Sequence, residues 1–78
     1  MTSLTLYYRQ ECHLCEQMLA EIHALYGDSV DVRLVDVDSE FELKKRYGLK
    51  VPVLAAGSRE ICYGRLDTAS LEEYLESI

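Results

Sequence analysis

The feature that most constrains the fold is the position of Cys12 and Cys15, at the boundary between two contrasting residue patterns. Residues 4–9, Leu-Thr-Leu-Tyr-Tyr-Arg, are rich in β-formers and are typical of a short buried strand. Residues 14–26 then repeat apolar side chains every three or four positions, as on one face of a helix, and Gly27 suits a C-cap. The two cysteines are therefore expected at the start of a helix that directly follows a strand.

The middle of the chain predicts a second strand and a second helix. Residues 30–37 alternate apolar and polar side chains before becoming apolar, which indicates a strand. Ser39 to Glu42 has the S-x-x-E form of a capping box, so we expect a short helix from there through Tyr47, stopped by Gly48.

The last third predicts a hairpin and a final helix. Residues 51–55 and 59–63 are strand-like and flank a plausible tight turn at Gly57-Ser58, so they should pair antiparallel. After Gly64, either Asp67 or Thr68 can cap a helix. The apolar stripe of that helix comprises Leu71, Tyr74, Leu75 and Ile78. The expected fold is α/β, in the order βαβαββα, with a mixed four-stranded sheet flanked by three helices.

Length and charge bound the class of protein. The chain has 78 residues, so residues 1–78 are expected to form a single domain, and we expect a monomer. The net charge of −6 is spread along the sequence, which disfavours nucleic acid and anionic membranes as partners. No apolar run is long enough to span a bilayer and no signal-peptide pattern begins the chain, so a soluble, cytoplasmic protein is expected.

The spacing of the cysteines suits dithiol exchange. Such exchange needs one thiol that is substantially thiolate near neutral pH and a second thiol that releases the product from the mixed disulfide. Cys12, at the positive end of the helix dipole, is the predicted nucleophile, and Cys15, one turn further on the apolar face, is the predicted resolving thiol. Arg9 would strengthen the thiolate, and so would His13 if protonated, although His13 is equally well explained as an exposed residue without a role.

A strand, a CxxC opening the next helix and a later Val51-Pro52 together resemble the thioredoxin superfamily, and the details are similar to glutaredoxins. The resemblance implies a thioredoxin-like fold and a cis bond before Pro52. It also implies that the Val51 backbone pairs with the peptide part of glutathione or of a protein substrate. Arg9 stands where glutaredoxins carry the basic residue that meets a glutathione carboxylate.

The glutaredoxin Gly-Gly-x-x-Asp segment is only partly kept, as Gly64-Arg65-Leu66-Asp67. The resemblance implies that Gly64 and Asp67 hold the γ-glutamyl end of glutathione. The second glycine of the family pattern is replaced by Arg65, which adds bulk where the backbone would approach the ligand. Glutathione is therefore expected as a possible co-substrate, and no tightly bound cofactor is expected.

The sequence leaves two functions open. The first is a glutaredoxin-like thiol-disulfide oxidoreductase that reduces protein or glutathione mixed disulfides through Cys12 and Cys15. The alternative is a metal-binding or redox-linked partner-binding module without turnover. Zinc would need further ligands from a short set of Cys62, His13 and His23, and we expect Cys62 to lie in the core and His23 to face solvent. No metal site is predicted.

Overall fold

The protein is described by a computed structural model that covers residues 2–78. The strands are β1 (Thr2–Tyr8), β2 (Val30–Asp36), β3 (Val53–Ala56) and β4 (Arg59–Tyr63). The helices are α1 (His13–Tyr26), α2 (Phe41–Tyr47) and α3 (Thr68–Glu76). Two short 3-10 turns, Gly27–Ser29 and Val37–Ser39, flank β2. The predicted order βαβαββα is therefore confirmed for these residues.

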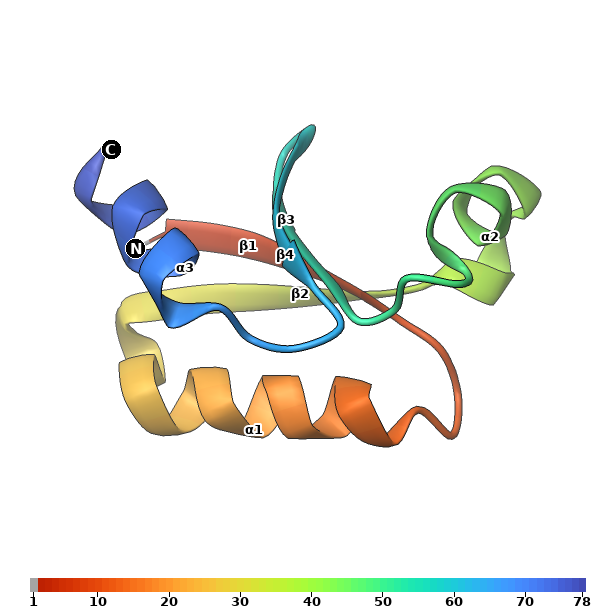
Figure 1. The fold of residues 1–78 in the computed structure, drawn as a ribbon, viewed down its shortest axis with the longest axis horizontal. Helices are drawn as coiled ribbons and strands as arrows, with labels where there is room; N and C mark the ends of the chain where they lie inside the picture. The colour runs from red at the N-terminus through yellow and green to blue at the C-terminus, as the bar shows by residue number, and fades with distance from the viewer. Residues whose placement is uncertain (1) are drawn as a thin grey trace.

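The four strands form one mixed sheet in the order β2-β1-β3-β4. β1 runs parallel to β2 and antiparallel to β3, which pairs antiparallel with β4 across the turn at Gly57. α1 and α3 lie on one side of the sheet, and α2 lies near one end of it (Figure 1). The strand order leaves β2 and β4 as the edges and places β1, which leads into the cysteine pair, in the interior of the sheet.

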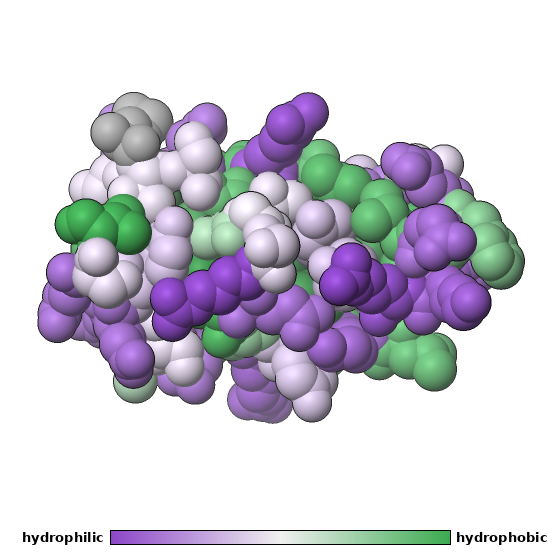
Figure 2. All heavy atoms as spheres, turned by 90° about the horizontal axis from the view of Figure 1, so that it is seen from above, coloured by the Kyte–Doolittle hydropathy of each residue, from purple (hydrophilic) through white to green (hydrophobic). Residues whose placement is uncertain are grey.

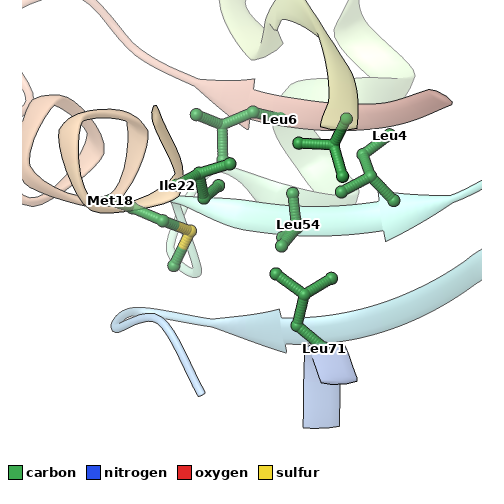
Figure 3. Packing of buried hydrophobic residues seen from close by; sticks show 7 residues of the cluster. Leu4, Leu6, Met18, Ile22, Leu54 and Leu71 are labelled. Carbon is green, nitrogen blue, oxygen red and sulfur yellow. The ribbon is translucent and has the colours of Figure 1, made fainter. Parts of the chain in front are cut away.

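The main core lies between the sheet and the two helices α1 and α3. Leu4 and Leu6 point from β1 toward Met18 and Ile22 of α1, as Figure 3 shows. The core is completed by Val30, Leu54 and Leu71. The periodicity of residues 14–26 overestimates the buried face of α1, because Leu14 and Leu25 remain 43% and 59% exposed.

A second, smaller cluster fixes the end of the sheet at which α2 lies. Val37, Tyr47 and Val53 are buried there, and the rings of Tyr7 and Tyr47 stack with their centroids 4.3 Å apart.

Figure 2 views the molecule from the side opposite α1, where polar side chains cover most of the surface and apolar groups appear between them. Among residues 2–78, no helix combines the length and apolar character that a membrane crossing requires.

The predicted capping box at the start of α2 is wrong. Ser39 lies in the 3-10 turn before α2, where its hydroxyl donates to the backbone oxygen of Asp36 at 2.6 Å. Glu40 is the N-cap residue of α2 and makes no side-chain capping hydrogen bond. The carboxylate of Asp36 instead accepts from the Asp38 N–H at 2.9 Å, so the polar residues here stabilise the turn rather than the helix.

Candidate redox site

Cys12 and Cys15 lie at the start of α1, as the sequence predicts, and a disulfide joins them. Cys12 is the N-cap residue, and its sulfur accepts a hydrogen bond from the backbone N–H of Cys15 at 3.1 Å. Cys15 is only 4% exposed, whereas Cys12 is half-buried. Cys12 is therefore the more accessible of the two residues, and its sulfur lies against a backbone N–H at the start of the helix, an arrangement that favours a thiolate after reduction.

Glu11, immediately before the pair, has an unusual backbone conformation. Its φ is +58°, in the left-handed region that costs about 1–2 kcal/mol for a residue with a Cβ. The side chain is exposed, so it gains nothing from burial in return. The chain turns here between β1 and α1, and Glu11 lines the same cavity as Cys12 and Cys15.

Arg9 is held within the protein rather than left free beside the sulfur. Its guanidinium donates to the two carboxylate oxygens of Asp38 at 3.1 and 3.2 Å and to the backbone oxygen of Gly48 at 3.2 Å. The hydrogen bond from Arg9 is the main reason that the pKa of Asp38 lies below its usual value. A glutathione carboxylate would have to compete with Asp38 for this guanidinium.

The segment Val51–Pro52 lies just before β3, and its peptide bond is cis. Pro52 is buried, and its backbone oxygen accepts from the Gly64 N–H at 2.8 Å. The N–H of Val51 donates to the Tyr47 oxygen at 3.1 Å. A substrate strand that paired with the Val51 N–H would therefore have to replace a bond that this backbone already makes.

Gly64 and Asp67 connect β4 to α3. Gly64 has a φ of +79°, and Asp67 is the N-cap residue of α3, accepting from the Ser70 N–H at 3.2 Å and the Ser70 hydroxyl at 2.9 Å. These hydrogen bonds lower the pKa of Asp67, with that from the Ser70 side chain contributing most. Of the two N-caps that the sequence left open, Asp67 and Thr68, the structure uses Asp67.

The same connection lies against the first turns of α1. A hollow of about 100 Å³ between them is lined by Leu14, Gln17, Met18, Glu21, Gly64, Arg65 and Leu66. Together with the bond from Gly64 to Pro52, this contact brings residues 51–52 and 64–67 together next to the helix that carries the cysteine pair. These segments are far apart in the sequence.

A larger cavity, of about 320 Å³, adjoins the disulfide and was not predicted from the sequence. It is lined by Leu6, Tyr8, Arg9, Gln10, Glu11, Cys12, Cys15, Glu16, Leu19 and Leu34. Tyr8, the last residue of β1, belongs to this lining. Leu34 fits the apolar alternation of β2, yet it is 49% exposed, so no pattern in the sequence indicated the cavity.

The remaining candidate ligands are dispersed. Cys62 is half-buried against the main core, and burial raises the pKa of its thiol. His13 and His23 are both exposed. Within residues 2–78, no three side chains from His, Cys, Asp and Glu are grouped so that they could hold a metal ion.

Comparison with known proteins identifies the family. A family model described as "Glutaredoxin-like domain (DUF836)" matches residues 3–76. The chain belongs to this glutaredoxin-like family. A comparison with curated proteins finds no match.

Solved structures confirm the thioredoxin-like fold of this glutaredoxin-like chain. It is similar to the Northeast Structural Genomics target protein XcR50 from X. campestris, with 34% identity over 96% of this chain and 97% of that chain and a TM-score of 0.72. Thioredoxin 1 from Thermosipho africanus is 19% identical, with a TM-score of 0.61 and 97% of each chain covered. A mutant thioredoxin from Halobacterium salinarum is 27% identical, with a TM-score of 0.60, over 96% of this chain and 72% of that chain. Family, fold and cysteine pair together support thiol redox function in general.

Proposed function

We propose that the protein is a thiol-disulfide oxidoreductase that reduces protein disulfides and glutathione mixed disulfides through Cys12 and Cys15. The observation that carries the proposal is the asymmetry of the pair: Cys12 is a half-buried N-cap residue, whereas Cys15 is buried. A reductase needs one sulfur that clients can reach and a second, sheltered sulfur that can attack the mixed disulfide formed at the first.

The reaction begins from the reduced pair. The Cys12 thiolate attacks one sulfur of the client disulfide, a bond forms between Cys12 and that sulfur, and the other sulfur leaves as a thiolate that takes up a proton. Cys15 then loses its proton, attacks the Cys12 sulfur and releases the client's second thiol. The product is the Cys12–Cys15 disulfide seen in the structure, which a low-molecular-weight thiol or a dithiol reductase must reduce again.

Glutathione is proposed as a co-substrate that competes for groups already engaged in the protein. Its carboxylate would replace that of Asp38 as the hydrogen-bond acceptor of the Arg9 guanidinium. Its peptide part would pair with the backbone of Val51, whose N–H donates to the Tyr47 backbone oxygen in this structure. Gly64 and Asp67 would meet the γ-glutamyl end, with the Asp67 carboxylate shared with Ser70. The proposed glutathione-binding set is Arg9, Val51, Pro52, Gly64 and Asp67. Because polar groups of this set already make hydrogen bonds within the protein, we expect weak rather than tight glutathione binding.

Trapping tests the assigned roles. The variant Cys15→Ser, placed in a Cys62→Ser background, should accumulate a mixed disulfide at Cys12 when mixed with oxidised glutathione or with a disulfide-containing protein. Cys12→Ser in the same background is the matched control and should accumulate no comparable adduct, because Cys15 is buried. Peptide mapping by mass spectrometry locates the adduct. If both variants remain free of adducts, the proposed reductase function is wrong.

A further inference from the structure

The cavity beside the disulfide lies on the side of β1 away from the Val51–Pro52 segment. Its lining residues come from β1, β2, α1 and the connection between β1 and α1, and none comes from residues 51–52 or 64–67. In the sheet, β2 and β3 occupy opposite sides of β1. The disulfide therefore has two different neighbours, residues 51–52 and 64–67 on one side and this cavity on the other, and Arg9 of the proposed glutathione-binding set also lines the cavity.

The interior of the cavity is apolar. Leu6 is 1% exposed, Leu34 is 49% exposed on the edge strand β2, and Leu19 is half-buried on α1. A volume of about 320 Å³ is enough for one large side chain but is at the lower limit of cavities that hold small molecules. An exposed leucine at the edge of such a cavity has apolar surface left for a partner to cover.

The mouth of the cavity is negatively charged. Glu11 and Glu16 are exposed and flank the cysteine pair in sequence, and both belong to the lining. The one cation in the lining, Arg9, is paired with Asp38 at 3.1 Å. Gln10 adds no charge, and its amide donates to the Asp36 carboxylate at 3.4 Å. A cationic partner is therefore complementary to this mouth, and an acidic one is repelled.

We propose that this cavity is a client-selecting subsite, which receives one large apolar side chain of a protein whose disulfide lies in a basic segment. The proposal rests on the proposed reductase function and names its substrate class. The apolar side chain of the client lies against Leu6, Leu19 and Leu34. Its lysine or arginine residues face Glu11 and Glu16, and its disulfide meets Cys12. The exchange steps are those given above, with an external thiol or dithiol as the final reductant.

Peptide substrates of graded sequence test the proposal. Each peptide carries one cysteine as a mixed disulfide with 2-mercaptoethanol, with either leucine or alanine two positions before and after it, and with either two lysines or two glutamates nearby. The reduced protein is kept reduced with a dithiol, and kcat/KM is measured from peptide masses. The leucine-lysine peptide should react about tenfold faster than the alanine-lysine peptide, and about threefold to tenfold faster than the leucine-glutamate peptide at low salt.

Variants assign these preferences to the cavity. Leu34→Thr keeps a β-former on the edge strand and should abolish the leucine preference, whereas Leu25→Gln, an exposed leucine outside the cavity, should keep it. The double variant Glu11→Gln and Glu16→Gln should reduce the lysine preference to below about twofold, and 0.3 M salt should do the same. Glu73→Gln on α3 is the charge control.

The outcomes separate this proposal from the reductase function. If no peptide and no small disulfide is reduced, the proposed function itself fails. If all four peptides are reduced at equal rates, reduction stands and the client-selecting subsite is wrong. Preferences that survive both Leu34→Thr and the double glutamate variant would also overturn it, because the selecting surface would then lie elsewhere. Preferences lost only in the cavity variants support it.

Discussion

The sulfurs of Cys12 and Cys15, which both lie at the start of α1, have very different surroundings. Cys12 is half-buried at the N-cap, whereas Cys15 packs under the first turn with 4% of its surface exposed. Cys62 differs again, since burial raises the pKa of its thiol. Because the thiolate is the reactive form and access limits attack, reactivity at the residue scale should follow these surroundings.

Alkylation of the reduced protein should report this order. With limiting iodoacetamide at pH 7, Cys12 should be modified about ten times faster or more than either Cys15 or Cys62. Timed quenching and peptide mapping by mass spectrometry give the three rates. Urea-unfolded protein is the control, in which the three rates should converge. Faster modification of Cys62 than of Cys12 in the folded protein would contradict the assignment of the nucleophile.

The charge of Asp67 should make stability depend on pH. Its pKa is lowered in the folded protein, so ionised Asp67 stabilises the fold above its unfolded pKa of about 3.9, and this contribution is lost as pH falls through the lower folded value. Asp67→Asn keeps an N-cap side chain but cannot ionise. The variant should be less stable than the parent at pH 7, and urea unfolding should show the gap closing below about pH 4. A gap of constant size across this range would exclude a role for the charge.

At the scale of elements, local sequence patterns predict the strands and helices well, but they predict the helix N-caps less reliably. The strand-helix boundary at the cysteine pair is correct because it depends on residues adjacent in sequence, whereas the sequence left the N-cap of α3 open between Asp67 and Thr68, and the structure uses Asp67. The capping box at Ser39 is wrong because Asp36, three residues earlier, competes for the same hydroxyl. The bonds that tie Arg9 to Asp38 and Gly64 to Pro52 join distant segments, so no local pattern contained them.

The connection between β4 and α3 depends on Gly64. Its φ of +79° disfavours residues with a Cβ, while no atom lies within 4 Å of the position that a Cβ would take. Gly64→Ala should therefore destabilise the protein through the backbone alone, by about 1–2 kcal/mol in urea unfolding. It should also weaken reduction of glutathione mixed disulfides, since Gly64 anchors this connection to Pro52. A variant as stable as the parent would show that the connection adopts another conformation.

At the scale of the whole molecule, one interior strand organises both the core and the site. β1 contributes Leu4 and Leu6 to the main core and ends where the chain turns toward Cys12. The cavity is bounded by β1, β2 and α1 together, with Leu34 of β2 exposed at its edge. Sequence patterns predict each of these elements, but they do not predict the space left between them, which depends on how α1 lies across the sheet (Figure 1).

The position of α1 across the sheet should depend on a few core side chains, and two residues of the same helix test this. Ile22 is fully buried against β1, so Ile22→Ala should lower the free energy of unfolding by about 2–5 kcal/mol. Leu25→Ala, one turn further and 59% exposed, should change it by less than about 0.5 kcal/mol. Urea unfolding of the oxidised protein measures both. A chain of 78 residues has a total stability of only about 4–12 kcal/mol, so Ile22→Ala should remove a large part of it. Equal effects of the two substitutions would mean that α1 does not pack as described, and the cavity and the half-buried position of Cys12 would lose their structural basis together.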